Sequence, residues 1–502
     1  MTALTPAVPE VPLAPIARTP AVTIVGAGFG GIGMAVRLAQ AGIDDITVLE
    51  RADRVGGVWA ANSYPGAACD IPASLYSFSF APRADWTRRY PPQEEIQAYL
   101  HDTAERFGVL PRIRFGTEVR SARFDEAAAR WVLDLADGST HACDVLITAC
   151  GQLSRPAIPA IPGREEFAGV AFHSATWRHD HDLTGRRVAV VGTGASAIQF
   201  LPHVAEQAAH TTLFQLDAPH VIPKPDRPYP PWLRAAFRRV PGLLRLNRAA
   251  TYVQYEMRAV AFTKWTGLMR LIDGQARRHL RRQVSDPTLR DAVAPQGEPG
   301  CKRILLSNDY YPALTRPSVE VVRTPISRVL PDGLRTDDGA VHPVDTIIWG
   351  TGFAATDFLT PMTVTGPGGR DLRETWADGA EAYLGIAVAG FPNLFLLYGP
   401  NTNLGHNSIV YMLESQIRYV VQAVRRVAAR PAALSVRPEV QRRFNEWVQD
   451  RITATVWDRG CTSWYRTASG RNTTNWPDFT FAYRARTRRF DEADYELTPV
   501  AR

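Results

Sequence analysis

Two glycine-rich turns contain the residues that are best placed to bind a reactive cofactor in this chain of 502 residues. The first contains Gly26, Gly28 and Gly31, and Glu50 follows 19 residues after the last of them. Such glycines permit a tight turn, close approach of backbone to a pyrophosphate, and close packing of a helix on a strand. Glu50 can accept hydrogen bonds from a ribose hydroxyl pair. The pattern predicts a dinucleotide-binding unit.

The same pattern occurs again at Gly192 and Gly194, with Ala197 in the third place. Ser196, inside this turn, begins a predicted helix. Two nucleotide-binding units in one chain imply two bound dinucleotides, and we expect one to be FAD and the other a nicotinamide dinucleotide.

Short apolar runs that end in turns predict the strands that must carry these sites. The predicted strands span 21–25, 46–49, 144–149, 187–191, 210–216 and 345–349. Helices are expected over 32–41 and 196–208, directly after the two turns. This order predicts an α/β fold with two Rossmann-like dinucleotide-binding domains.

The segment 226–295 is dense in arginine and in apolar residues at helical spacing, so we predict a helical insertion there. Its basic face could rest on a membrane surface, but we interpret it as a solvated face. The remaining divisions are a disordered leader over 1–20, an FAD-binding domain over 21–165 and 345–502, and an NADP-binding domain over 166–225 and 296–344.

Composition narrows the class of protein. With 45% hydrophobic and 21% charged residues the chain is an ordinary globular protein. The five cysteines include no C-x-x-C pair, so we expect neither a disulfide framework nor a metal site, and a reducing cytoplasm fits. No apolar run is long enough for a membrane span, and the surplus of 57 Lys and Arg over 50 Asp and Glu comes with no nucleic-acid recognition motif.

Three further stretches carry a resemblance to a known family. They read F-x-G-x3-H-x3-W at 167–177, G-G-V-W-x4-Y-P-G-x3-D at 56–70, and K-R at 302–303 followed by Y-Y at 310–311. With these motifs the sequence resembles the Baeyer–Villiger monooxygenases, which are class B flavin-dependent monooxygenases, over about residues 21–476. Arg178 stands where that family usually has Pro or Asp.

The resemblance implies FAD, NADPH and O₂, and conversion of a ketone to an ester or lactone through a C4a-peroxyflavin. It implies that Arg303 holds the negatively charged oxygen species and that Asp70 pairs with Arg303 and orients it. The chemistry agrees, because a guanidinium stays charged at any working pH and a buried anion is costly without a fixed cation.

The same resemblance implies further cofactor contacts. Gly57, Trp59 and Asp70 belong to the long motif at the flavin, Lys302 is a partner for the 2′-phosphate of NADPH, and Trp464 contacts the nicotinamide ribose. His173 belongs to a linker that moves during the cycle, so we expect a conformational role for it.

One departure from the family affects coenzyme choice. Where the family usually has an Arg after the second strand of the nicotinamide domain, this chain has Leu216 and Asp217. Leu216 cannot bind a phosphate, and Asp217 would repel one that it faced. We therefore expect NADPH to be used with weak discrimination against NADH.

Three alternatives remain. A flavin monooxygenase oxidising sulfur or nitrogen uses related domains, but Trp177 and Arg303 favour ketone oxidation. A flavin-dependent disulfide reductase needs paired cysteines, and Cys69 has no neighbouring cysteine in the sequence. A nucleic-acid-binding module would need recognition motifs that we do not find.

Overall fold

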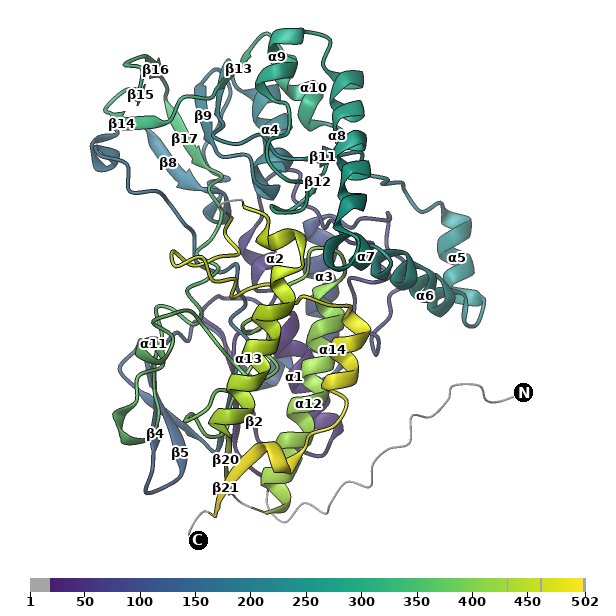
Figure 1. The fold of residues 1–502 in the computed structure, drawn as a ribbon, viewed down its shortest axis with the longest axis vertical. Coiled ribbons are helices and arrows are strands. Elements are labelled where there is room, and N and C mark those ends of the chain that lie inside the picture. Colours follow the sequence, from purple (N-terminus) through teal and green to yellow (C-terminus); the bar gives the residue numbers. More distant parts are fainter. Residues whose placement is uncertain (1–18, 431, 461–462, 500–502) are drawn as a thin grey trace.

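The computed structural model describes residues 19–430, 432–460 and 463–499. The leader expected over 1–20 falls almost wholly outside these residues, as does Cys461. The described chain folds into two α/β bodies, one above the other in Figure 1, with a group of helices at their side. This arrangement confirms the predicted fold class.

The first body is built on a five-stranded parallel sheet in the order β19-β7-β1-β2-β3. Its strands are β1 (Val22–Val25), β2 (Ile46–Leu49), β3 (Ile113–Arg114), β7 (Val145–Thr148) and β19 (Leu394–Leu396). The helix α1 (Phe29–Gln40) follows β1 and begins three residues earlier than predicted, because Gly28 already occupies the N-cap position.

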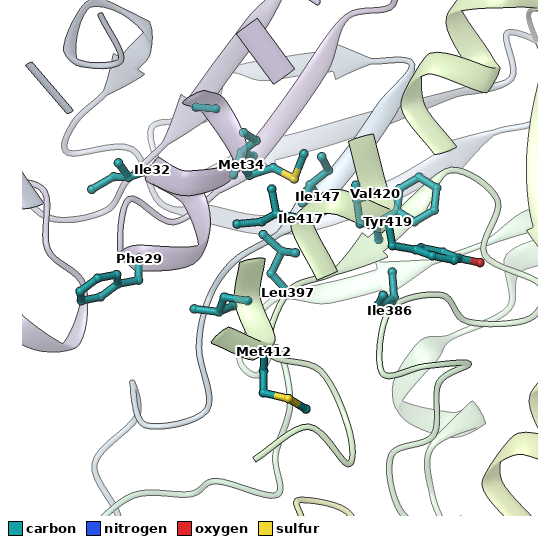
Figure 2. Packing of buried hydrophobic residues seen from close by; sticks show 14 of the residues in the cluster. Phe29, Ile32, Met34, Ile147, Ile386, Leu397, Met412, Ile417, Tyr419 and Val420 are labelled. Carbon is teal, nitrogen blue, oxygen red and sulfur yellow. The ribbon is translucent and has the colours of Figure 1, made fainter. Parts of the chain in front are cut away.

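The core of this body lies between the sheet, α1 and the long helix α12 (Ile409–Ala429). Figure 2 shows Met34 of α1 and Ile417 of α12 beside Ile147 of the sheet. All three side chains are at most 2% exposed. A parallel sheet buried on both faces needs such near-continuous apolar strands, and β7 reads Val-Leu-Ile-Thr.

The second body holds another five-stranded parallel sheet, in the order β13-β10-β9-β17-β8. Its strands are β8 (Val170–His173), β9 (Arg187–Val191), β10 (His210–Phe214), β13 (Val319–Val322) and β17 (Thr346–Trp349). The helix α4 (Ala195–Gln207) follows β9 as predicted.

The position of β17 corrects the domain boundary expected at residue 345. All four residues of β17 are buried, and the strand pairs with β9 on one side and β8 on the other. Asp345 also accepts a hydrogen bond from the backbone N–H of Arg187, over 2.9 Å. The chain therefore leaves the second sheet only after Trp349.

Smaller elements, not predicted from the sequence, surround the two sheets. They are β4 (Val119–Asp125), β5 (Arg130–Leu135), β6 (Thr140–Cys143) and β18 (Thr363–Thr365) in one sheet, β14 (Ile326–Leu330), β15 (Gly333–Thr336) and β16 (Val341–Pro343) in another, and the pairs β11 (Val221–Ile222) with β12 (Leu305–Leu306) and β20 (Ala432–Val436) with β21 (Tyr495–Pro499). The remaining helices outside the insertion are α2 (Val58–Ala61), α3 (Gln93–Arg106), α10 (Tyr310–Leu314), α11 (Leu372–Thr375), α13 (Pro438–Thr453) and α14 (Thr480–Arg486).

The segment 226–295 is helical, as predicted. It contains α5 (Pro231–Arg239), α6 (Leu243–Glu256), α7 (Ala259–Thr263), α8 (Met269–Gln283) and α9 (Pro287–Ala292). In Figure 1, α5 and α6 extend to the side of the molecule, while α8 runs along the second body. Leu280 of α8 joins the core of that body.

Two findings concern cysteines and membranes. Cys69, Cys143 and Cys150 are free thiols, but Cys301 is disulfide-bonded, which the cysteine spacing did not indicate. Among the described residues, none of the helices combines the length and the apolar character that crossing a bilayer requires.

The close packing of the first glycine turn leads to a prediction about the effect of a substitution at Gly31 on stability. A Cβ atom on Gly31 would lie 1.8 Å from the carbonyl oxygen of Gly26, whereas one on Gly30 would lie 3.4 Å from its nearest neighbour, the Cβ of Ala149. We expect Gly31→Ala to lower the free energy of unfolding by about 1–3 kcal/mol through overpacking. The matched variant Gly30→Ala should stay close to the parent protein in denaturant titrations. Equal midpoints for both variants would contradict the predicted clash at Gly31.

The burial of His406 leads to a prediction about how folding stability depends on pH. Burial lowers its pKa to about 3, and both ring nitrogens lack a hydrogen-bond partner among the described residues. Glu256 Oε2 lies 4.0 Å from Nε2, too far for a hydrogen bond. Below about pH 6.5 the unfolded chain binds a proton that the folded chain does not, so stability present above that pH is lost as pH falls, by about 1.4 kcal/mol per pH unit.

Replacing this histidine should remove that loss. We expect the denaturant midpoint of His406→Gln to fall less between pH 7 and pH 5 than that of the parent protein. His101→Gln, a change at an exposed histidine of α3, serves as the control. A His406→Gln profile parallel to that of the parent would argue against the buried neutral imidazole.

Candidate active site

The N-terminus of α1 presents backbone donors that no side chain occupies. Its N-cap is Gly28, and no side-chain hydrogen bond caps the helix. Gly26 has a φ of +103°, which favours glycine and makes the turn between strand and helix. Free N–H groups at a helix N-terminus, together with the helix dipole, bind anions such as phosphate.

Glu50 lies beside this turn, at the end of β2. Its Oε2 accepts a hydrogen bond from the backbone N–H of Ala27 over 2.7 Å, and its Oε1 accepts one from Ala52 over 2.9 Å. These bonds hold a buried carboxylate next to the glycine turn, and each oxygen keeps lone pairs for a further donor.

The long motif packs directly onto the same turn. A Cβ on Gly57 would lie 3.1 Å from the Cα of Gly28, so the two loops touch. Trp59, on the short helix α2, donates its indole N–H to the hydroxyl of Tyr76 over 3.1 Å. The structure therefore brings Gly28, Glu50, Gly57 and Trp59 to one place.

The far end of the motif brings Asp70 to Arg303. Arg303 Nη2 lies 3.7 Å from Asp70 Oδ2, and the Asp70 side chain is only 12% exposed. The other carboxylate oxygen, Oδ1, is buried and has no hydrogen-bond partner among the described residues. A buried acceptor without a donor is costly, so this oxygen fits a bound polar group.

Arg303 keeps its charge despite its surroundings. Burial disfavours the guanidinium, but the charge of Asp70 outweighs that effect, so the pKa of Arg303 lies above its ordinary value. The side chain is 38% exposed. The arrangement is a fixed cation beside an acceptor, which can stabilise negative charge on a reacting oxygen.

Two tyrosines at this place were missed by sequence reasoning. Tyr398 has a φ of +62°, an uncommon conformation for a non-glycine residue, and donates its hydroxyl to Asn403 Oδ1 over 2.7 Å. Burial raises the pKa of Tyr465 to about 12 and raises that of Tyr398 as well, so both hydroxyls stay protonated. The one sequence signal was the buried strand β19 ending just before Tyr398.

The second turn repeats the geometry of the first. Gly192 has a φ of +104°, and Gly194 is the N-cap of α4, again without a side-chain cap. Ser196 lies in the first turn of α4, and Gln199 of the same helix accepts a hydrogen bond at Oε1 from the hydroxyl of Tyr64 in the long motif, over 3.0 Å. The second turn thus faces the loop that carries Asp70.

Lys302 lies near this second turn but is already paired. Its Nζ lies 2.6 Å from Asp217 Oδ2, and both side chains are about half exposed. Leu216 is 67% exposed and contributes no charge. The structure therefore places Lys302 at the end of β10, where its charge is shared with Asp217.

Trp464 lies next to Tyr465, with ring centroids 4.3 Å apart. It packs against an apolar cluster that includes Phe262 of α7 and Trp457. The motif around it begins at Cys461 and Thr462, which lie outside the described residues.

His173 ends β8, opposite Trp349 in β17. Its Nδ1 accepts a hydrogen bond from the backbone N–H of Ala175 over 3.1 Å, and burial lowers its pKa. The imidazole is therefore neutral at pH 7 and sits where the chain leaves the second sheet. Trp177 of the same motif packs against Tyr64 and Phe200.

Among the described residues, Cys69 and Cys150 lack the properties of redox-active thiols. Burial raises the pKa of the Cys69 thiol to about 12, and the same holds for Cys150. A thiol of this kind is not a nucleophile at neutral pH, which argues against the disulfide reductase. No group of His, Cys, Asp and Glu among the described residues could hold a metal ion.

Comparisons with known proteins identify relatives of the chain. Residues 23–260 match the family described as pyridine nucleotide-disulphide oxidoreductase. The chain is 46% identical over 479 residues to a Baeyer–Villiger monooxygenase of Streptomyces coelicolor, which covers 95% of this chain and 92% of that protein.

Solved structures agree as well. An oxidized steroid monooxygenase bound to NADP superposes with a TM-score of 0.85 at 31% identity, covering 96% of this chain and all of that one. The enzyme OTEMO in complex with FAD and NADP gives a TM-score of 0.87 at 26% identity, with 96% and 100% covered. With its paired nucleotide turns, its Asp70–Arg303 contact and this near full-length similarity, the chain belongs to the Baeyer–Villiger monooxygenase family.

Proposed function

We propose that this enzyme binds FAD at the first turn and NADPH at the second, and that Arg303 and Asp70 act at the place where O₂ oxidises a ketone to an ester or lactone. The FAD domain comprises residues 21–165 and the chain after Trp349, the NADP domain comprises 166–225 and 296–349, and the helical insertion comprises 226–295. The observation that carries the proposal is the Asp70–Arg303 contact within 3.7 Å.

The residues of the first site fit FAD. The free N–H groups of α1 suit a pyrophosphate, Glu50 suits a ribose, and Gly57 and Trp59 belong to the loop packed on the turn. When bound, FAD supplies the two-electron chemistry that activates O₂. At the second site, the N-terminus of α4 with Gly192, Gly194 and Ser196 suits the coenzyme pyrophosphate.

The role of Arg303 follows from charge. Oxygen transfer to a carbonyl carbon develops negative charge on oxygen, and a fixed donor aimed at that charge costs no reorganisation. Asp70 acts by holding the guanidinium, and its own carboxylate, which is only 12% exposed, would be left without a cation if Arg303 were absent. Tyr398 and Tyr465 remain neutral donors beside it.

For the compartment we propose the cytoplasm. Cys69, Cys143 and Cys150 are free thiols, as is usual in a reducing environment, whereas Cys301 is disulfide-bonded.

Arg303→Ala tests the central role. We expect the variant to bind FAD and to be reduced by NADPH near the parent rate, but to form ester at least about 10²-fold more slowly. Stopped-flow absorbance follows flavin reduction, and gas chromatography follows the ester. Arg316→Ala, a surface arginine paired with Glu206, is the matched control. Ester formation at the parent rate in Arg303→Ala would refute the assignment.

Leu216→Arg tests coenzyme choice. A guanidinium at the end of β10 would add a charge-assisted hydrogen bond to the 2′-phosphate, and we expect the KM for NADPH to fall by about tenfold. The KM for NADH should hardly change, because NADH has no such phosphate. Leu216→Gln, similar in size but neutral, provides the comparison. Equal changes for the two coenzymes would remove the idea.

A further inference from the structure

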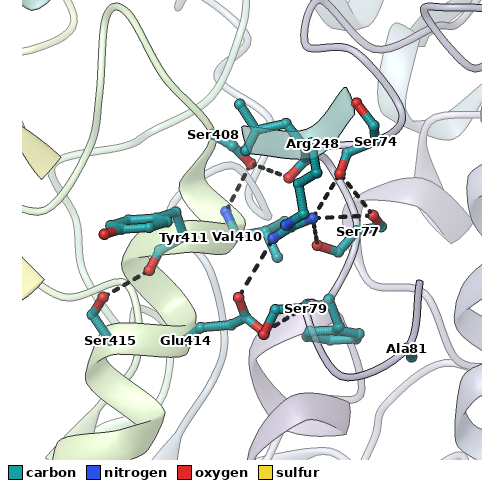
Figure 3. A network of polar contacts seen from close by, with 12 residues as sticks. Ser74, Ser77, Ser79, Ala81, Arg248, Ser408, Val410, Tyr411, Glu414 and Ser415 are labelled. Carbon is teal, nitrogen blue, oxygen red and sulfur yellow. Dashed lines mark hydrogen bonds and ion pairs between the residues drawn. The ribbon is translucent and has the colours of Figure 1, made fainter. Parts of the chain in front are cut away.

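Helix α6 packs on the rest of the protein through the side that carries Arg248 and Glu256. Arg248 donates from Nη1 to the carbonyl oxygens of Ser74 and Ser77, over 2.7 and 2.9 Å, and its Nη2 lies 3.6 Å from Glu414 Oε2. Figure 3 shows this guanidinium between the Ser74–Ser77 loop and α12. The charge is thus paired inside the protein, and the Arg248 side chain is only 19% exposed.

The C-terminal end of α6 is anchored in the same way. Glu256 is buried and accepts hydrogen bonds from the backbone N–H of Thr480 over 2.6 Å and from Asn407 Nδ2 over 2.5 Å. The hydroxyl groups of Tyr255 and Tyr90 lie 2.7 Å apart. These contacts fix which face of α6 points outward.

The outward face of α6 carries large apolar side chains, with Arg245 and Gln254 also exposed. Leu246, Val253 and Met257 are 66%, 57% and 62% exposed, and their spacing of seven and four residues puts them on one side of the helix. A helix that faces water normally shows the opposite arrangement. This inversion indicates an apolar environment on the outer side.

Elements next to α6 expose further large apolar side chains. Trp232 at the start of α5, Trp265 after α7 and Leu271 in α8 are 71%, 71% and 70% exposed. Of the fourteen exposed large apolar side chains in the described residues, eight lie between 232 and 271. We call the outward side of α5–α8 over these residues the insertion surface.

The charged side chains of the same segment are almost all basic. Residues 227–272 contain nine Lys and Arg and a single acidic residue, Glu256, which is buried. Arg238, Arg239, Arg245 and Lys264 are exposed beside the apolar side chains. Apolar side chains, interfacial tryptophans and a cationic border are the combination that binds an anionic lipid surface.

We propose that the insertion surface docks on the face of an anionic lipid bilayer, with the apolar side chains entering the headgroup region and the cations pairing with lipid phosphates. A second copy of the chain is a poorer occupant, because a two-fold interface would bring the same cations face to face. The proposal rests on the insertion alone and does not depend on the reaction.

Vesicle sedimentation tests the proposal with the full-length, FAD-loaded enzyme. We expect it to pellet with vesicles of phosphatidylcholine mixed with phosphatidylglycerol, to pellet poorly with phosphatidylcholine alone, and to be released as NaCl is raised. Binding that is absent, or equal for both vesicle types and insensitive to salt, would overturn the proposal.

A variant locates the surface. The triple change Leu246→Ser, Val253→Ser and Trp265→Ser should reduce vesicle binding at least about tenfold and leave ketone oxidation in solution unchanged, which also reports that the protein folds. Val341→Ser, an exposed apolar residue of β16 at the far side of the molecule in Figure 1, is the matched control. Equal binding by the triple variant and the parent would overturn the proposal.

A second measurement separates the lipid from other occupants. Analytical ultracentrifugation of the parent and the triple variant reports self-association. If the parent is oligomeric, the triple variant is monomeric, and neither binds vesicles, the surface is an interface between copies and the proposal fails. Quenching of tryptophan fluorescence by brominated lipid should decrease in Trp265→Phe while binding stays, and unchanged quenching would contradict insertion of this side chain.

Discussion

The contact between Asp70 and Arg303 ties together parts of the chain that have little else in common. Asp70 is the last residue of the motif that packs on the first glycine turn. Arg303 lies far along the chain, two residues before β12. The carboxylate of Asp70 is only 12% exposed, and removing it from water is costly unless the nearby guanidinium of Arg303 offsets that cost. The two bodies must therefore be positioned so that the pair forms.

This constraint explains the surroundings of the pair. Neutral groups fill the space around it: Cys69 stays a thiol, and Tyr398 and Tyr465 stay protonated. A titrating neighbour would change the field at Arg303 across the working pH, whereas these groups keep it constant. The uncommon backbone of Tyr398, held by Asn403 and by Gln416 at its N–H, places a hydroxyl there at some cost in strain.

What the sequence could predict was local. The glycines of both turns, the strands beside them and Glu50 follow from rules that act within a few residues, and the structure places them as expected. The pairing of Lys302 with Asp217, the membership of β17 in the second sheet and the disulfide at Cys301 depend on contacts between distant segments. Arg303 and Asp70 could be named only through the family motifs, since an isolated arginine and aspartate are usually surface charges.

In the helical insertion, too, contacts between distant segments decide what the sequence alone could not predict. Its arginines suggested a solvated face, because periodicity reveals that a helix has two sides but not which side turns inward. The partners of Arg248 and Glu256 decide this, and they turn the polar side toward the protein. Phe262 of α7 packs in a buried cluster with Trp457 and Tyr465, and Tyr465 is a neighbour of Arg303. The insertion therefore carries the exposed apolar side chains and also contacts the surroundings of Arg303.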